Sequence, residues 1–214
     1  MEVVIAGGHG KVALRLTRQL SGRGVRVRSL IRDPAQPADV RDVGGDPVIC
    51  DLEAAGDELA DVVGRADAVV FAAGAGPGSG PARKEAVDYG AAVKLMDAAR
   101  INDIRRFVMV SSMGADADAD AEGDGMGPYL RAKGRADEAL RASGLDFTIV
   151  RPGHLVDAAG SGLVMVGDHV APGDISRDDV AAVLVAVLHE PAASGRTFEV
   201  VGGAVPVAAA LASL

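Results

Sequence analysis

The sequence predicts a three-layer α/β fold built around one doubly wound parallel sheet. Short apolar runs rich in β-branched residues recur along the chain, and segments with helical periodicity separate them. Most of these runs are apolar at nearly every position, as expected for strands that helices cover on both faces. Because helices alternate with the strands, the connections are crossovers, and crossovers make neighbouring strands parallel.

The predicted elements follow one another in a regular order. Strands are expected, in chain order, at residues 3–7, 25–31, 47–50, 68–73, 106–112 and 147–152, and helices at 11–22, 56–64, 83–102, 128–143 and 177–189. The segment after the sixth strand reads as one further strand, the last helix and a final strand at 196–202. The chain of 214 residues can bury the core of one large domain. We therefore expect a single domain, 1–214, in which residues 153–214 form a small lid on the substrate side.

The composition narrows the range of ligands. A net charge of -8, aromatic residues at 3% and the absence of Trp disfavour binding to nucleic acid or to an anionic membrane surface. No window approaches about 18 consecutive apolar residues, so we expect no transmembrane span. The amino terminus does not resemble a signal peptide, and the single cysteine, Cys50, suits a reducing compartment. We therefore expect a cytoplasmic monomer or homodimer that binds a small-molecule substrate.

Three loops rich in Gly, Pro or Asp each follow a predicted strand, at residues 74–81, 114–128 and 153–162. The carboxyl ends of parallel strands form the edge of the sheet where ligands bind, so these loops are expected to surround a site. The charged stretch at 82–87, just after the first loop, is expected to begin a helix with a solvated face.

A glycine-rich turn joins the first strand to the first helix. Gly8, Gly10 and Ala13 fit the pattern G-x-G-x-x-G/A, and Gly7, Gly10 and Ala13 fit an overlapping G-x-x-G-x-x-A pattern. Such a turn lets the backbone approach a pyrophosphate, which then meets free N–H groups and the positive end of the helix dipole. A tight turn with a purely structural role is the alternative, but the position between strand and helix favours dinucleotide binding. The expected contacts are Gly7, Gly8, His9, Gly10, Lys11 and Val12.

The ends of the second and third strands bear on the choice of cofactor. Arg32 lies 22 positions beyond Gly10, where a guanidinium can bind the 2′-phosphate of NADP. Its neighbour Asp33 keeps the alternative of NAD open, and Arg32 could also be a solvated charge. We expect NADP(H) to be favoured over NAD(H). Asp51, just past the third strand, could hydrogen-bond the adenine or cap a helix.

A second motif lies near the start of the fourth predicted helix. Tyr129 and Lys133 stand at i and i+4, so their side chains share one face of the helix, and Ala136 continues the same apolar face. A lysine on that face is unusual for an amphipathic helix. Its ammonium would favour the phenolate, so Tyr129 could move a proton close to neutral pH. Ser111 and Ser112 end the preceding strand, where a hydroxyl could polarise a substrate carbonyl or only bond a turn.

Together these motifs resemble the short-chain dehydrogenase/reductase superfamily, and an Arg-Pro-Gly sequence after the sixth strand adds to the resemblance. The chain is most similar to the atypical branch of small Rossmann-type NAD(P)H-binding proteins, akin to NmrA-like regulators and biliverdin/flavin reductases. The resemblance implies a catalytic set of Ser112 (or Ser111), Tyr129 and Lys133. It implies cofactor contacts from Gly7, Gly10, Arg32, Asp51 and Leu52 at the adenosine half, from Ala72, Ala73 and Gly74 beside ribose and nicotinamide, and from the backbone of Pro152 and Gly153 to the carboxamide. Ser111, Lys133 and His154 are also expected to contact the cofactor near its nicotinamide end.

Three functions are compatible with these residues. The leading hypothesis is an NADP(H)-dependent oxidoreductase that acts on a small carbonyl, quinone or similar acceptor, with Tyr129 as the proton donor. The first alternative is a redox-sensing regulator that binds NAD(P)H without turnover, although such a sensor needs no Ser–Tyr–Lys set. The second is an isomerase of the epimerase/dehydratase type. Only about 60 residues follow Arg-Pro-Gly, which is short for a nucleotide-sugar pocket.

No metal site is expected. Asp116, Asp118 and Asp120 begin like a calcium-binding loop, but Ala121 replaces the required glycine and Gly127 stands where the bidentate glutamate should be. The acidic residues between 116 and 124 are instead expected to form a solvated, mobile loop beside the site.

Overall fold

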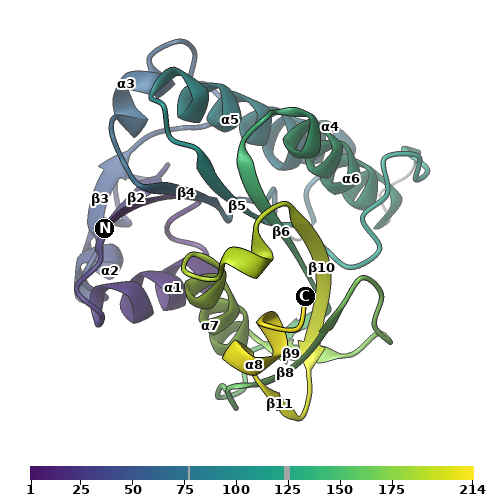
Figure 1. Ribbon diagram of the computed structural model, residues 1–214. Helices are drawn as coiled ribbons and strands as arrows, with labels where there is room; N and C mark the ends of the chain where they lie inside the picture. The colour runs from purple at the N-terminus through teal and green to yellow at the C-terminus, as the bar shows by residue number, and fades with distance from the viewer. Residues whose placement is uncertain (77, 123–125) are drawn as a thin grey trace.

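The computed structural model describes residues 1–76, 78–122 and 126–214. Within them, nine strands form one central sheet in the order β11-β8-β10-β6-β5-β4-β1-β2-β3, and a further pair, β7 and β9, forms a small separate sheet (Figure 1). The strands are β1 (Glu2–Ala6), β2 (Arg26–Ile31), β3 (Asp46–Ile49), β4 (Ala68–Phe71), β5 (Arg106–Val110), β6 (Asp146–Pro152), β7 (His154–Val156), β8 (Leu163–Gly167), β9 (Asp174–Ser176), β10 (Arg196–Gly202) and β11 (Val205–Pro206).

Helices cover both faces of the sheet, which makes the predicted three layers. In Figure 1, α1, α7 and α8 lie on one side of the sheet and α3, α5 and α6 on the other. The helical segments are α1 (Lys11–Ser21), α2 (Pro37–Asp42), α3 (Leu59–Val63), α4 (Pro81–Lys84), the π-helical η1 (Glu85–Gly90), α5 (Ala91–Ile101), α6 (Met126–Ala142), α7 (Arg177–Val187), the 3-10 turn η2 (Pro191–Ala193) and α8 (Val207–Leu211).

The alternation of side chains along β1 explains why the core has two halves. Val3 and Ile5 are fully buried in the cluster that includes α1 and α7, whereas Val4 and Ala6 are fully buried in the cluster that includes α3, α5 and α6. Successive strand residues point to opposite faces, so a strand that is apolar throughout contributes to both clusters. The prediction of a sheet covered on both faces is therefore confirmed.

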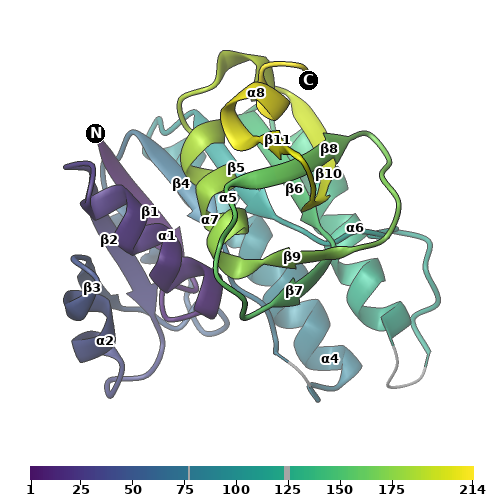
Figure 2. The same cartoon turned by 90° about the horizontal axis from the view of Figure 1, so that it is seen from below.

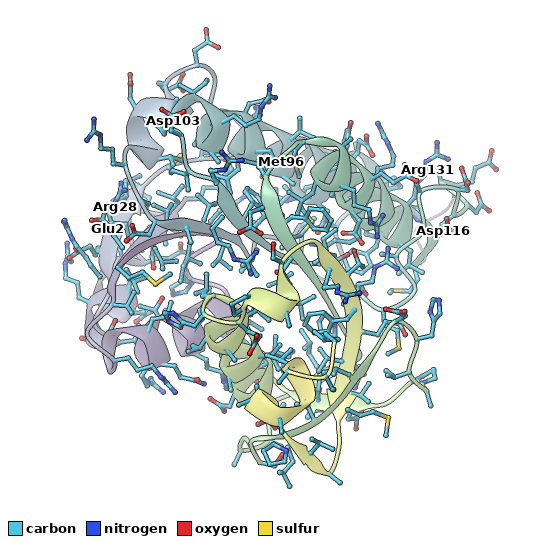
Figure 3. All side chains as sticks on the ribbon, in the orientation of Figure 1. Glu2, Arg28, Met96, Asp103, Asp116 and Arg131 are labelled. Carbon is cyan, nitrogen blue, oxygen red and sulfur yellow. The ribbon has the colours of Figure 1, made fainter. Side chains whose placement is uncertain are left out.

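Strands β1 to β6 are parallel, and their spatial order reverses at β1. β1 pairs with β2 on one side and with β4 on the other, with Ile5 opposite Ser29 and Val70 respectively. The first helices of the two halves therefore lie on opposite faces, and a crevice opens at the carboxyl ends of β1 and β4. This is the doubly wound arrangement of a Rossmann-type fold, as predicted. Arg28 on β2 also pairs with Glu2 on β1 at 2.6 Å (Figure 3).

The segment after β6 contains more strands than the sequence predicted. β10 pairs in parallel with β6, but β8 runs antiparallel to β10, and the two-residue β11 pairs with β8. β7 and β9, of three residues each, pair with one another. Figure 2 shows this pair beside the carboxyl-terminal end of the parallel sheet, below β8. Much of residues 153–214 thus extends the central sheet, and closure of this segment over a ligand stays a prediction.

Two other differences are local. Helix α2 was not predicted from the sequence; its six residues begin with Pro37, and Val40 is the one that is buried. The helix expected at 83–102 is a continuous helical stretch in which the π-helical η1 separates α4 from α5. Among the described helices, none has the length and apolarity required to cross a membrane.

Candidate cofactor and active site

Two adjoining cavities lie at the carboxyl ends of the parallel strands. The smaller, of about 270 Å³, extends over the ends of β2 and β3, and the larger, of about 920 Å³, lies between the end of β5, α6 and the loop after β6. Both are lined by Gly10 and by residues 72–75, which follow β4. The two cavities therefore meet at the reversal point between β1 and β4, where open α/β sheets bind their ligands.

The glycine turn is tightly packed against the strands beneath it. Gly7 has a φ of +77°, and a Cβ there would lie 2.5 Å from the Cα of Ala73. A Cβ on Gly8 would lie 2.4 Å from the Cβ of Ser29 on β2. Gly10 precedes α1, and among the described residues no side chain caps this helix and no acidic residue occupies its first turn. The turn therefore brings an uncapped, electropositive helix end to the junction of the two cavities.

The smaller cavity has a polar mouth. Arg32, Gln36, Asp51, Glu53 and Arg83 contribute its polar lining, and the remaining lining residues include Gly7, His9, Leu30, Ile31, Cys50, Leu52 and Val87. Asp51 accepts the N–H of Glu53 at 3.0 Å, which fixes the turn after β3. Nε2 of His9 lies 2.6 Å from Oδ2 of Asp39 on α2, so α2 helps to hold the glycine turn.

Tyr129, Lys133, Ser111 and Ser112 all line the larger cavity. Tyr129 and Lys133 lie one turn apart on α6, and the Nζ of Lys133 is 6.0 Å from the centre of the Tyr129 ring. The Oγ of Ser112 donates to the carbonyl of Met113 at 3.2 Å, whereas Ser111 is buried at the end of β5. The structure thus brings together in one cavity the groups that the sequence placed on a strand end and a helix.

Lys133 has a buried partner that the sequence did not indicate. Its Nζ lies 3.1 Å from Oδ1 of Asp88 on η1, and both side chains are almost completely buried. The same ammonium donates to the carbonyls of Val110 at 3.2 Å and Ala73 at 3.4 Å. Burial by itself lowers the pKa of Lys133, but Asp88 and then Tyr129 outweigh it and raise this pKa above its ordinary value. Lys133 is therefore charged at neutral pH.

A family model described as NAD(P)H-binding matches residues 7–191. The chain belongs to this NAD(P)H-binding family. The matched region includes the glycine turn, both cavities and the Tyr129–Lys133 pair.

Relatives of this NAD(P)H-binding protein align along its whole length. YhfK of Bacillus subtilis (strain 168), described as an uncharacterized sugar epimerase, is 35% identical over 215 residues, which are 100% of both chains. A structure from Bacillus halodurans, described as an NAD-dependent epimerase/dehydratase, is 37% identical with a TM-score of 0.92 and full coverage of both chains. The oxidoreductase ylbE from Lactococcus lactis is 26% identical with a TM-score of 0.87, covering 100% of this chain and 96% of the other.

The two cavities fit a pyridine dinucleotide of the kind that this NAD(P)H-binding family takes. The uncapped start of α1 supplies backbone N–H groups for a diphosphate where the cavities meet. The smaller cavity would take the adenosine half, beside Arg32 and Leu52, and the larger would take the nicotinamide half, beside Lys133.

Most of the residues expected to contact the cofactor line one of the two cavities. Gly8 and His154 are absent from the described lining. Gly8 packs on Ser29, and the side chain of His154 is 78% exposed and lies 2.9 Å from Asp174 of β9. Pro152 and Gly153 line the larger cavity, but the N–H of Gly153 donates to the carbonyl of Val200 on β10 at 2.9 Å. The N–H of Gly153 therefore supports the sheet, and the expected backbone contact of Pro152 and Gly153 with a carboxamide stays a prediction.

Sequence reasoning missed Lys84 and Asp88. The stretch 82–87 was expected to have a solvated face, but Lys84 is only 8% exposed, Asp88 is fully buried, and both line the larger cavity. The expectation was therefore wrong for Lys84. A signal was present: Lys84, Asp88, Ala91 and Leu95 follow the i, i+3, i+4 spacing of one helix face, and the apolar members show that this face is buried.

Arg83, Glu53 and Arg177 were also missed. Arg83 and Glu53 line the smaller cavity, and Arg177, the first residue of α7, lines the larger. Each is a charged residue at the edge of an element, and sequence spacing does not show which distant strand end such a residue faces.

The acidic loop after β5 lies partly within the described residues. Asp116, Asp118 and Asp120 are exposed, as predicted, while Asp124 lies outside the described residues. The N–H of Asp116 donates to the carbonyl of Leu130 at 3.1 Å, so this part of the loop lies against α6 (Figure 3). In the described part of the chain, no group of three or more His, Cys, Asp or Glu side chains could hold a metal ion.

Proposed function

We propose that the protein is an NADP(H)-dependent oxidoreductase that acts on a small carbonyl, quinone or similar acceptor. One observation carries the proposal: Tyr129, Lys133 and Ser112 line a single cavity that adjoins the glycine turn. A protein that only bound the dinucleotide would need the turn and the adenosine cavity, but not a phenol, an ammonium and a hydroxyl at the other end.

The chemistry divides between the dinucleotide and these side chains. When bound, the nicotinamide supplies or accepts a hydride at the substrate carbon. In the direction of reduction, Tyr129 donates the hydroxyl proton to the substrate oxygen and regains a proton from solvent. Ser112 donates a hydrogen bond to the same oxygen as negative charge develops on it. For that role its hydroxyl must turn away from the carbonyl of Met113, to which it donates at 3.2 Å.

Lys133 acts on Tyr129 through its charge. The ammonium is held by Asp88 and by the carbonyls of Val110 and Ala73, so its position is fixed before any ligand binds. A positive charge at this distance from the phenol stabilises the phenolate that remains after proton donation. Asp88 offsets part of that charge, so we regard Asp88 as a positioning residue that keeps Lys133 protonated and in place.

The preference for NADP(H) over NAD(H) rests on the residues after β2. Arg32 lines the smaller cavity, where its guanidinium can bind a 2′-phosphate. The carboxylate of Asp33, which could instead have accepted a ribose hydroxyl, accepts the N–H of Ala35 at 2.9 Å and is absent from the described lining. We propose a cytoplasmic setting and a monomer or homodimer on the sequence grounds given above.

Steady-state kinetics with NADPH and a panel of quinones, flavins and aldehydes test the proposal. We expect NADPH to be consumed with at least one acceptor, and we expect Tyr129→Phe to lower kcat by at least about 100-fold. Tyr129→Phe should leave the Kd of NADPH unchanged, because the phenol is not needed to hold the dinucleotide. Tight NADPH binding without turnover of any acceptor would instead identify a sensor.

Isomerase chemistry is the second candidate, because the described functions of YhfK and of the Bacillus halodurans structure are those of epimerases. The same phenol and ammonium can serve a reaction in which hydride leaves the substrate and returns to it. The two reactions differ in stoichiometry: an oxidoreductase consumes one dinucleotide per product, and an epimerase consumes none. Incubation with nucleotide sugars, followed by measurement of the dinucleotide consumed and the product formed, distinguishes the two reactions.

A further inference from the structure

Two arginines and one glutamate from three different elements meet at the mouth of the smaller cavity. Oε1 of Glu53, after β3, lies 3.0 Å from Nη1 of Arg32, after β2, and 2.9 Å from Nη2 of Arg83 in α4. All three side chains line the cavity. Both guanidiniums therefore converge on a single carboxylate oxygen.

The position of Glu53 is set by its backbone. Its N–H donates to Oδ1 of Asp51 at 3.0 Å, and its carbonyl accepts the ammonium of Lys94 at 2.8 Å. The N–H of Ala55 closes the same turn on the carbonyl of Asp51 at 2.8 Å. The turn thus fixes the backbone of Glu53, and the two guanidiniums hold its side chain.

The charges around this oxygen bear on what the two arginines can bind. Two guanidiniums contact the one carboxylate of Glu53, and the other carboxylate of the described cavity lining, that of Asp51, accepts the N–H of Glu53. A phosphate monoester carries about -1.5 to -2 at neutral pH, together with three acceptor oxygens, so it matches two guanidiniums better than a carboxylate does. The two arginines could therefore hold a more highly charged anion in place of the Glu53 carboxylate.

We infer that Arg83 is the second arm of the 2′-phosphate site, opposite Arg32, and that Glu53 is the internal anion that a 2′-phosphate displaces. The inference rests on the proposed preference for NADP(H) and deepens it. Glu53 then weakens the preference for NADPH that the two arginines create, because its carboxylate competes with the 2′-phosphate for the guanidiniums. NADH carries a hydroxyl in place of this phosphate and does not need to displace Glu53.

Equilibrium titrations of the full chain with NADPH and NADH test the inference, with the variants Arg83→Ala, Arg32→Ala and Glu53→Gln. We expect Arg83→Ala to raise the Kd of NADPH about 10-fold to 100-fold, as loss of a charged hydrogen bond does, and to change the Kd of NADH by less than about threefold. Glu53→Gln keeps the shape of the side chain and removes its charge, so the Kd of NADPH should fall about fivefold. Arg100→Ala is the matched control, since Arg100 pairs with Asp97 on the exposed side of α5 and should affect neither Kd.

Adenosine 2′,5′-bisphosphate and ADP provide a second measurement without the nicotinamide half. Arg83→Ala should weaken binding of adenosine 2′,5′-bisphosphate and leave binding of ADP unchanged. Equal losses for NADPH and NADH, or no loss, would overturn the role of Arg83. A weaker affinity of Glu53→Gln for NADH, with that for NADPH unchanged, would make Glu53 an acceptor for the ribose hydroxyl and overturn its role as the competing anion. Failure of the unaltered protein to bind either dinucleotide would instead overturn the proposed function itself.

Discussion

The carboxylate of Asp88 lies 3.1 Å from the ammonium of Lys133, and neither side chain is more than 5% exposed. The two residues come from η1 and α6, which pack against one another on the same face of the sheet (Figure 1). Each charge is therefore compensated mainly by the other. This pair joins the wall of the larger cavity to its proposed catalytic helix.

Removal of one member of this pair should destabilise the fold. Asp88→Asn leaves a buried ammonium without its counter-charge, and we expect a loss of about 3–5 kcal/mol in the free energy of unfolding. The double variant Asp88→Asn/Lys133→Met should recover much of this loss, because it removes both the ammonium and its counter-charge. Urea denaturation of the two single variants and the double variant measures the coupling, and strictly additive losses would contradict it.

The same pair predicts a dependence on alkaline pH. Since the pKa of Lys133 is raised in the folded state, the stability it contributes is fully present below the ordinary lysine pKa, about 10.4. That contribution is lost as the pH rises through the folded pKa. The difference in unfolding free energy between the unaltered protein and Lys133→Met should therefore shrink above about pH 10.4. If this difference in unfolding free energy stayed constant above about pH 10.4, the Asp88–Lys133 pair would not be the source of the stability lost in Lys133→Met.

The two neighbouring serines should have separable roles. Ser112 is partly exposed to the larger cavity, and Ser111 is 3% exposed at the end of β5. If Ser112 stabilises the developing oxyanion, Ser112→Ala lowers kcat by about 100-fold, with little effect on the Kd of NADPH. Ser111→Ala should change kcat far less and act mainly on cofactor binding. Stopped-flow kinetics and binding titrations on both variants decide this, and the reverse pattern would exchange the roles of the two serines.

Local motifs were predictable from the sequence because their physics is local. The glycine turn follows from steric demands at Gly7 and Gly8, and the Tyr129–Lys133 pair follows from helix geometry. The spacing within each helix shows that Asp88 and Lys133 lie on buried faces, but no spacing pattern shows that these two faces meet, so Asp88 was missed as the partner of Lys133. Glu53 and Arg83 were missed for the same reason: only the order of the strands brings the ends of β2 and β3 next to α4.

Part of the carboxyl-terminal segment was missed for a different reason: the sequence predicted one strand before the last helix, where the structure has β7, β8 and β9. β8 alternates between buried Val164 and exposed Leu163 and Met165, and it lies near the edge of the sheet. Residues 163–166 are nevertheless all apolar, so this run fits the one further strand that the sequence predicted before the last helix. β7 and β9 have three residues each, and so short a strand has no recognisable periodicity.

Asp179 should make the carboxyl-terminal segment sensitive to acid. Its carboxylate accepts the N–H groups of Ser161 at 3.0 Å and Gly162 at 2.7 Å and the hydroxyl of Ser176 at 2.9 Å. Burial alone raises the pKa of Asp179, but these donors outweigh it and hold the pKa below its ordinary value. The resulting stability is present above the ordinary pKa, about 3.9, and is lost as the pH falls through the folded pKa.

We therefore expect Asp179→Asn to lower the free energy of unfolding by about 2 kcal/mol at pH 7, with the difference shrinking below about pH 4. Urea denaturation across this range measures it. The adjacent Asp178→Asn is the control, because Asp178 is 39% exposed and its pair with Arg15 at 3.3 Å should contribute less than about 1 kcal/mol. Equal effects of the two substitutions would refute a special role for Asp179.

Gly134 and Gly90 should respond in opposite ways to a methyl group. A Cβ on Gly134 of α6 would lie 2.2 Å from the backbone N of Ala117, so Gly134→Ala must displace the loop that follows Ser112. We expect a loss of about 1–3 kcal/mol in stability and a lower kcat, with the Kd of NADPH nearly unchanged.

Gly90, the last residue of η1, has helical φ and ψ angles, and the one contact that a Cβ there would make with the described residues is the carbonyl of Glu85 at 3.5 Å. Gly90→Ala should therefore stabilise the protein by about 0.5–1 kcal/mol, because alanine loses less conformational entropy in a helix. Thermal unfolding of the two variants should show shifts of opposite sign, since about 1 kcal/mol moves the Tm of a chain of this size by roughly 2–4 °C. If Gly134→Ala left both the Tm and kcat unchanged, the loop after β5 would not depend on its contact with α6 for the position of Ser112.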